Sequence, residues 1–170
     1  RIPLLIGRLI SFEAFAVYLL DERRGELRTA YTVGYPAPGQ PLRLKLGIGL
    51  VGAAIFSKQP LLVNNLPADP RYVEFVPGMM SEIVVPLMHQ SRPIGALNIL
   101  SRHQNQFTER DVDILRQFAA HVAVAAPGTQ PRHPRFVAAD REEGDRRPGG
   151  DRRGADHVEG GGDRGPRLGV

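Results

Sequence analysis

The sequence predicts an α+β domain built around a β-hairpin. Two apolar runs, residues 83–88 and 94–100, are separated by a polar loop at residues 89–93, which is the pattern of two paired strands. Neither run alternates cleanly between apolar and polar residues, and this indicates strands that are covered on both faces. After the hairpin, Thr108 begins a segment with apolar residues at helical spacing. We therefore expect the hairpin in the middle of a sheet, with other elements packed above and below it.

The first part of the chain predicts a helix end followed by three strands. Residues 2–10 are apolar, and we interpret them as the end of a helix whose beginning lies outside this sequence. Residues 14–20 and 27–33 predict two strands, joined by a charged turn in which Gly25 can take a positive φ. Residues 42–46 alternate between apolar and polar residues and predict a half-exposed strand.

A short helix, a strand and a single helical turn are expected next. The pattern becomes helical after Gly49 and stops at Pro60, and residues 61–65 predict a strand. Asp69 and Pro70 offer an N-cap and a first-position proline for a single-turn helix over residues 71–75. The helix between Gly49 and Pro60 has an apolar face that consists of Leu50, Val51, Ala54 and Ile55.

The last predicted element is a helix that begins at Thr108 and stops before Pro127. Thr108 and Asp111 have the spacing of a capping box. Residues 127–170 are rich in Gly, Pro and Arg, and too poor in apolar residues to offset the entropy of ordering them. We expect a disordered tail there and hypothesise a shifted reading frame, with a natural flexible linker as the alternative. The predicted domains are residues 1–126 and the tail.

The composition excludes several classes of chemistry. The 170 residues include no cysteine, so disulfides, thiolate metal sites and cysteine nucleophiles are excluded. The net charge of +4 is spread along the chain without a basic cluster, so we expect no direct binding to nucleic acid. No apolar run approaches the roughly 20 residues that span a bilayer, and no signal peptide is visible, so we expect a cytoplasmic protein without a membrane contact.

The residues in this order resemble the GAF domain family over about residues 10–125. The resemblance rests on five short motifs: G-x-G-L-x-G from Gly47, D-P-R-Y from Asp69, S-x-x-V-V-P-L from Ser81, I-G-x-L-N from Ile94 and F-T-x-x-D from Phe107. It implies a central antiparallel sheet of five to six strands. The terminal helices would lie on one face, and a small-molecule pocket with short helices on the other.

The resemblance also implies a function. It is to GAF domains found ahead of bacterial histidine kinase, diguanylate cyclase or sigma-factor-regulating serine phosphatase domains. We therefore expect a sensory module of a bacterial signal-transduction protein that binds an unknown small molecule, forms a homodimer through its terminal helices and passes a change to an output domain absent from this chain. The alternative is a ligand-free structural or dimerisation domain. No catalytic constellation is visible in the sequence, so we expect no enzymatic activity.

The resemblance places the ligand pocket by the positions of the elements. One face of the hairpin would form its floor near Ser81 and Ile83, and the other face would carry the last helix. Polar residues would orient the ligand within mostly apolar walls. The implied ligand-binding residues are Tyr18, Leu50, Val51, Ile55, Asn65, Tyr72, Phe75, Ser81 and Ile83.

The sequence contains patterns that bear on several possible cofactors. Gly47, Gly49 and Gly52 form a G-x-G-x-x-G pattern, which is either a dinucleotide fingerprint or a tight turn into a pocket helix. Asn64 and Asn65 stand where the fingerprint expects an acidic residue, which favours the turn. The signature of cyclic-nucleotide GAF domains is absent, and bilin attachment and the free methionine sulfoxide reductase branch both require cysteine. The histidines show no metal spacing, so we expect no cofactor.

Overall fold

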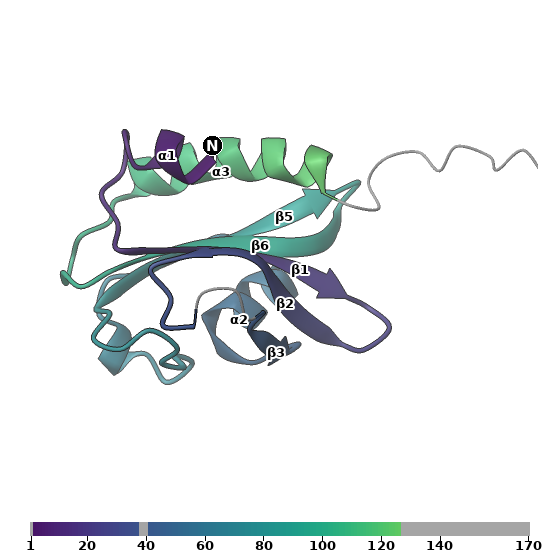
Figure 1. The fold of residues 1–170 in the computed structure, drawn as a ribbon, viewed down its shortest axis with the longest axis horizontal. Helices are drawn as coiled ribbons and strands as arrows, with labels where there is room; N and C mark the ends of the chain where they lie inside the picture. The colour runs from purple at the N-terminus through teal and green to yellow at the C-terminus, as the bar shows by residue number, and fades with distance from the viewer. Residues whose placement is uncertain (1, 38–40, 127–170) are drawn as a thin grey trace, which may run out of the picture. The chain divides into compact units, whose positions relative to one another are not determined.

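The structure is a computed structural model that describes residues 2–37 and 41–126. Within these residues the chain forms a six-stranded antiparallel sheet in the order β3-β2-β1-β6-β5-β4 (Figure 1). The predicted α+β class is confirmed. The elements are α1 (Ile2–Ile6), β1 (Ala14–Asp21), β2 (Glu26–Val33), β3 (Arg43–Lys45), α2 (Gly49–Ser57), β4 (Leu61–Val63), the 3₁₀ helix η1 (Leu66–Ala68), β5 (Ser81–His89), β6 (Arg92–Ser101) and α3 (Glu109–Ala125).

Helices cover both faces of the sheet, which explains the two-sided apolar strands. Figure 1 shows α1 and α3 on one face and α2 on the other. Successive residues of a strand point to opposite faces, so Ile83 of β5 packs in the cluster with α3, whereas Val84 packs in the cluster with α2. The hairpin β5–β6 thus lies between two separate apolar cores.

The hairpin turn is shorter than the predicted loop of residues 89–93. Gln90 and Ser91 alone form it, with φ values of 47° and 64°. Positive φ at both central residues is the conformation of a two-residue type I′ turn, whose twist matches that of the strands. The flanking His89 and Arg92 therefore pair with each other in the ladder instead of lying in the loop.

Pro86 lies inside β5, where a proline normally breaks the ladder of hydrogen bonds. It is tolerated because β4 pairs only with β5 residues from Glu82 to Val84. Beyond that point no described strand pairs with the outer side of β5, and on that side a proline removes no hydrogen bond of the ladder.

The predicted single-turn helix over residues 71–75 does not form. The Asp69 carboxylate instead accepts hydrogen bonds from the backbone N–H of Arg71 at 2.9 Å and from its guanidinium group at 2.6 Å. Such a local side-chain turn competes with helical hydrogen bonds. The regular turn of this region is η1, which precedes Asp69.

One further difference concerns the N-terminal end of the described chain. The N-terminal helix ends at Ile6 instead of residue 10, because the segment from Gly7 to Ile10 forms a turn. The predicted tail, residues 127–170, lies outside the described residues. None of the described helices is both long and apolar enough to cross a membrane.

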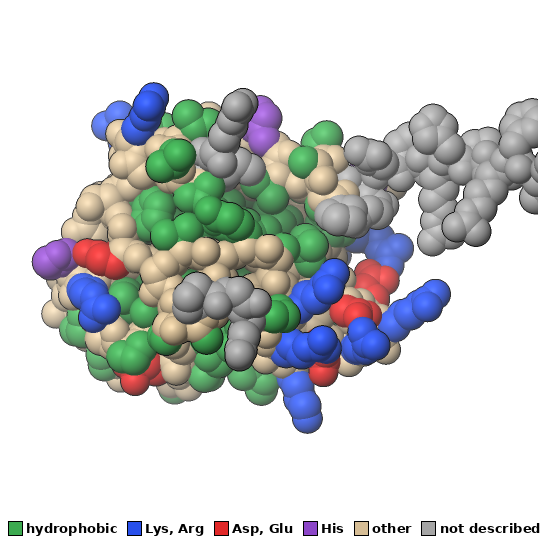
Figure 2. Space-filling model, viewed as in Figure 1, with side chains coloured by type: hydrophobic (Ala, Val, Ile, Leu, Met, Phe, Trp, Pro, Cys, Tyr) green, Lys and Arg blue, Asp and Glu red, His purple; other side chains and the backbone are tan. Residues whose placement is uncertain are grey.

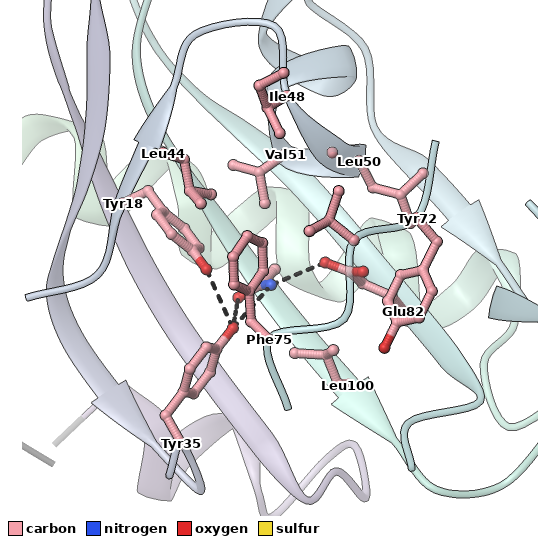
Figure 3. Close-up of a pocket in the computed structure, with 13 residues that line it drawn as sticks. Tyr18, Tyr35, Leu44, Ile48, Leu50, Val51, Tyr72, Phe75, Glu82 and Leu100 are labelled. Carbon is pink, nitrogen blue, oxygen red and sulfur yellow. Dashed lines mark hydrogen bonds between the residues drawn. The ribbon is translucent and has the colours of Figure 1, made fainter. Parts of the chain in front are cut away.

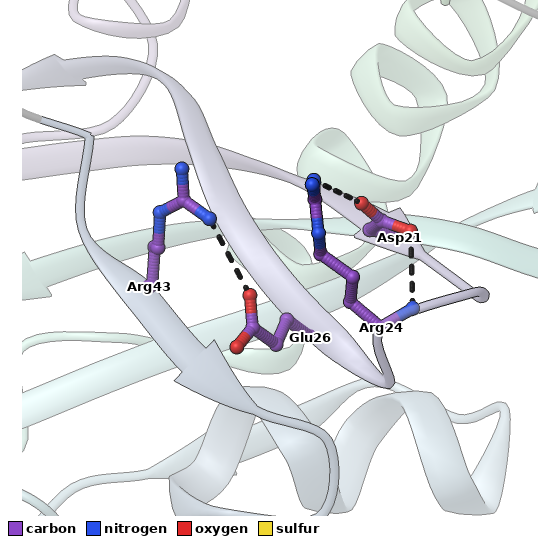
Figure 4. A network of polar contacts seen from close by, with 4 residues as sticks. All are labelled: Asp21, Arg24, Glu26 and Arg43. Atoms are coloured by element: carbon purple, nitrogen blue, oxygen red, sulfur yellow. Dashed lines mark hydrogen bonds and ion pairs between the residues drawn. The ribbon is translucent and has the colours of Figure 1, made fainter. Parts of the chain in front are cut away.

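The strands β1, β2 and β3 are also linked by exposed ion pairs (Figure 4). Asp21 lies 3.3 Å from Arg24 across the first turn, and Glu26 lies 3.6 Å from Arg43 between β2 and β3. Gly25, between them, has the expected positive φ of 61°. Exposed pairs of this kind contribute at most about 1 kcal/mol each, so the apolar clusters hold these strands in place.

Apolar side chains remain exposed on the side of the sheet that carries α1. Leu4 and Leu5 of α1 and Tyr31 and Val33 of β2 are exposed. Figure 2 shows apolar side chains gathered at the surface between the helices and the sheet. We call the four residues Leu4, Leu5, Tyr31 and Val33 the α1–β2 apolar patch.

We predict that Asp111→Ala lowers the free energy of unfolding by about 1 kcal/mol, as other losses of a helix cap do. The Asp111 carboxylate accepts hydrogen bonds from the backbone N–H and the hydroxyl of Thr108, at 2.8 and 2.9 Å, and so begins α3. Urea denaturation measures the change. Asp113→Ala, which removes an exposed carboxylate of the same helix, is the control; equal losses in the two variants would show that the cap is not responsible.

Candidate functional site

A small cavity lies between the sheet and α2 (Figure 3). Its volume of about 20 Å³ leaves room for about one water molecule. A larger molecule therefore enters only if part of the wall moves. The residues that line it include Tyr18 of β1, Tyr35 after β2, Leu50 and Val51 of α2, Tyr72 and Phe75 before β5, Glu82 of β5, and Asn98 and Leu100 of β6.

A chain of polar side chains crosses the cavity. The Asn98 side-chain amide donates a hydrogen bond to Oε1 of Glu82 at 2.9 Å. The Tyr35 hydroxyl donates to Oδ1 of Asn98 at 3.4 Å and lies 3.3 Å from the Tyr18 hydroxyl. Three strands and a loop thus supply one connected network, drawn as dashed lines in Figure 3.

Burial dominates the electrostatics of this network. Glu82 is 4% exposed, and burial raises the pKa of its carboxyl to about 7, against the hydrogen bond from Asn98, which lowers it. Burial likewise raises the pKa of Tyr35 to about 12 and raises the pKa of Tyr18 further, so both phenols stay neutral. The cavity thus contains one group, Glu82, that can gain or lose a proton near neutral pH.

The Tyr72 hydroxyl is buried beside the network and has no hydrogen-bond partner among the described residues. A buried hydroxyl without a partner destabilises the folded state. Tyr72 comes from the extended segment after Asp69, which covers the cavity, and burial raises the pKa of its hydroxyl to about 12.

We predict that Tyr72→Phe leaves the free energy of unfolding unchanged or raises it by up to about 1 kcal/mol, because it removes an unpaired buried polar group. Tyr35→Phe, by contrast, should lower it by about 1 kcal/mol, because that hydroxyl is hydrogen-bonded to Asn98 and lies beside the Tyr18 hydroxyl. Chemical denaturation of the two variants tests the contrast. A larger loss in Tyr72→Phe than in Tyr35→Phe would contradict it.

Five of the nine sequence-predicted residues line this cavity, namely Tyr18, Leu50, Val51, Tyr72 and Phe75. The other four lie elsewhere.

Ile83 is placed incorrectly by the sequence, because its side chain packs on the face that carries α3. Ser81 is buried, and its hydroxyl donates a hydrogen bond to the backbone carbonyl of His103 at 2.7 Å. Asn65 is exposed beyond the end of β4, and Ile55 packs in the core under α2. A shift of one residue along a strand reverses the face, so the floor from β5 is Glu82.

Sequence reasoning missed Tyr35, Glu82 and Asn98. Asn98 interrupts an apolar strand with a polar side chain, and Glu82 directly precedes the apolar residues of β5. Both signals were present in the sequence. Tyr35 lies in the Pro- and Gly-rich loop after β2, where no periodic pattern identifies an inward-facing residue.

The glycine motif before α2 has backbone roles. Gly47 and Gly49 have φ values of 91° and 72°, and a Cβ on Gly52 would lie 2.7 Å from the backbone carbon of Gly47. The motif therefore forms a tight turn against the first turn of α2. All the described strands around it pair antiparallel, whereas a dinucleotide fingerprint requires a parallel β-α-β unit. Within residues 2–37 and 41–126, no three His, Asp or Glu side chains gather as a metal site would require.

A second hollow adjoins the cavity at its outer side. It has a volume of about 200 Å³ and shares Tyr35 and Phe75 with the inner cavity, and Pro41 and Leu42 line it further out. Tyr35 and Phe75 thus separate the inner cavity from the hollow.

Comparisons with known proteins agree with this architecture. A family model described as GAF domain matches residues 5–125. Protein YtsP of Bacillus subtilis (strain 168) is 30% identical over 102 residues, and the match covers 60% of this chain. It covers 61% of YtsP, so the chain spans about three fifths of that relative's length.

Two solved structures with the same fold are enzymes. A free methionine-R-sulfoxide reductase from Neisseria meningitidis, in complex with its substrate, is 31% identical with a TM-score of 0.62, and the match covers 68% of each chain. A type II free methionine-R-sulfoxide reductase from Thermoplasma acidophilum is 26% identical with a TM-score of 0.64, covering 71% of this chain and 83% of that one.

These similarities contradict our expectation that the domain is not an enzyme. The expectation rested on the lack of a catalytic motif, but activity depends on side chains that folding brings together, and a fold can host several functions. Glu82 and Asn98 are such a pair, since they come from different strands. The chain contains no cysteine, so a reaction here would not use a thiol of this chain.

Proposed function

This chain belongs to the GAF domain family, and we propose that it is a regulatory module that binds a small molecule in the cavity between β1, β5, β6 and α2. One observation carries the proposal: a buried polar network, Glu82–Asn98–Tyr35–Tyr18, stands within apolar walls. A mostly apolar cavity with a few convergent polar groups is the usual composition of a small-molecule site.

The hairpin β5–β6 supplies a physical route from this site to α3. Glu82 and Asn98 face the cavity, while their neighbours Ile83 and Ile99 pack in the cluster that contains Leu115 of α3. A ligand that changes the spacing of these strands would change the packing of α3, by no more than its difference in affinity for the two states. We propose that an output domain outside this chain receives that change.

The terminal helices also support a proposed homodimer. The α1–β2 apolar patch, residues Leu4, Leu5, Tyr31 and Val33, exposes large side chains that a second copy could cover. Sedimentation equilibrium of the full chain tests this. A monomer at all concentrations, or a dimer that Leu4→Glu leaves intact, would contradict the proposed surface.

A screen of small metabolites by thermal shift, followed by NMR mapping of the bound site, tests the proposed ligand binding. Val51→Phe should fill the cavity and abolish binding, while Val124→Phe, on the exposed side of α3, should keep it. Far-UV circular dichroism confirms that both variants are folded. If ligands bind equally well to the two variants, the cavity is not the site.

The similarity to the reductase of Neisseria meningitidis favours a second candidate, a reaction on a bound small molecule. A carboxyl with a pKa of about 7, such as Glu82, suits a general acid or base. Free methionine-R-sulfoxide with a reductant serves as the negative comparison, because that reductase branch requires a cysteine and the chain has none. A metabolite from the screen that the original chain converts and Glu82→Gln does not would support catalysis, and equal conversion by both proteins would contradict it.

A further inference from the structure

Glu82 is a buried carboxylate without a cationic partner. Asn98 is its hydrogen-bond partner, and no Lys, Arg or His among the described residues lines the cavity or forms an ion pair with Glu82. An ionised carboxylate removed from water without a counter-charge is unfavourable. A cation bound beside Glu82 would therefore stabilise its ionised carboxylate in the folded chain.

We propose that the cavity recognises its small-molecule ligand through a cationic group, an ammonium or amidinium, that pairs with Glu82. The inference rests on the proposed function, since it assumes that this cavity is the ligand site. The rest of the cavity fits such a group. The Tyr72 hydroxyl, unpaired and close by, can accept a second hydrogen bond, and Leu50, Val51 and Leu100 exclude water from the pair.

The same arrangement disfavours anionic ligands. A carboxylate or phosphate placed in the cavity would face Glu82, and the described part of the chain lines the cavity with no positive side chain. Like charges in a buried site repel strongly. A neutral ligand would leave the ionised carboxylate of Glu82 without a counter-charge. The site would thus select its ligand by charge.

Pairing with a cation would also release a proton from Glu82. The titratable groups around Glu82 are Tyr18 from β1, Tyr35 from the loop after β2, and Asp69 and Tyr72 from the segment before β5. α2 contributes apolar side chains to the cavity, and β6 contributes Asn98. Because burial keeps the pKa of Glu82 near 7, a cation binds most strongly above that pH, where no proton has to leave.

The test compares n-alkylamines from methyl to hexyl with alcohols and carboxylates of the same lengths, on the full chain at equal ionic strength. Differential scanning fluorimetry and calorimetry measure the affinity at pH 6 and pH 8. We expect the amines to bind more tightly than their matched alcohols and carboxylates, and about tenfold more tightly at pH 8 than at pH 6. Glu82→Gln should weaken amine binding by about tenfold or more.

Glu74→Gln is the matched control, because Glu74 is an exposed glutamate near the cavity that does not line it. Its affinity for amines should equal that of the original chain. Alcohols or carboxylates that bind as tightly as amines, or amine binding that survives Glu82→Gln, would overturn the cationic ligand while the cavity remains a ligand site. If neither these series nor the metabolite screen yields a ligand, both proposals fail together.

Discussion

Replacing Glu82 with glutamine is expected to raise the free energy of unfolding by about 3 kcal/mol at pH 8 and to leave it nearly unchanged at pH 4.5. The carboxyl of Glu82 has a pKa of about 7 in the folded protein and an ordinary value of 4.5 when unfolded. Because its pKa is higher in the folded state, the folded protein binds this proton more tightly than the unfolded chain does. The stability that protonation supplies is therefore complete below pH 4.5 and is lost as the pH rises to 7. A shift of that size corresponds to about 3 kcal/mol.

Glutamine resembles the protonated acid, and its carbonyl oxygen can still accept the hydrogen bond from Asn98. Guanidinium denaturation of Glu82→Gln and of the original chain, from pH 4.5 to pH 8, gives the difference between their free energies of unfolding at each pH. The contributions of the other titrating groups are the same in both proteins and cancel in this difference. Glu22→Gln, which removes an exposed carboxylate paired with Arg92, is the control and should keep the pH dependence of the original chain. Parallel curves for Glu82→Gln and the original chain would mean that Glu82 does not titrate as described.

Gly95→Ala is expected to lower the free energy of unfolding by about 3 kcal/mol, or to prevent folding. A Cβ on Gly95 would lie 2.0 Å from the backbone carbonyl oxygen of Tyr18, because β1 and β6 approach closely at this pair of strands. The clash involves backbone on both sides, so side-chain rotation cannot relieve it, and overpacking of this kind is strongly destabilising. The displaced strand would also move Tyr18, which lines the cavity.

Gly25→Ala separates this steric effect from the loss of glycine itself. Gly25 has a positive φ of 61° but open space around its Cβ position, so the substitution should lower stability by only about 1 kcal/mol through backbone strain. Thermal and urea denaturation of both variants measure the contrast. If Gly95→Ala is no more destabilising than Gly25→Ala, the close approach of β1 and β6 is not a constraint on this fold.

The local elements could be predicted because each rests on residues close together in the sequence. The apolar runs on either side of residues 89–93 predicted a hairpin, and Thr108 with Asp111 predicted the start of α3. The prediction of a helix after Asp69 was wrong, because an aspartate carboxylate that accepts a hydrogen bond from a nearby backbone N–H can either cap a helix or close a turn. The sequence shows the same Asp-Pro pair in both cases, and Asp69 closes a turn with Arg71.

The sequence by itself determined the strands, the long helix, the glycine turn and the absence of thiol chemistry, because composition and short-range periodicity decide these. Only the tertiary structure decided which face each strand residue occupies, and it placed Glu82 in the cavity and Ile83 under α3. It also joined Glu82 to Asn98, Tyr35 and Tyr18, which are up to 64 positions distant along the chain. The pairing register of the sheet creates both results, and a register is a property of several strands together that no single segment encodes.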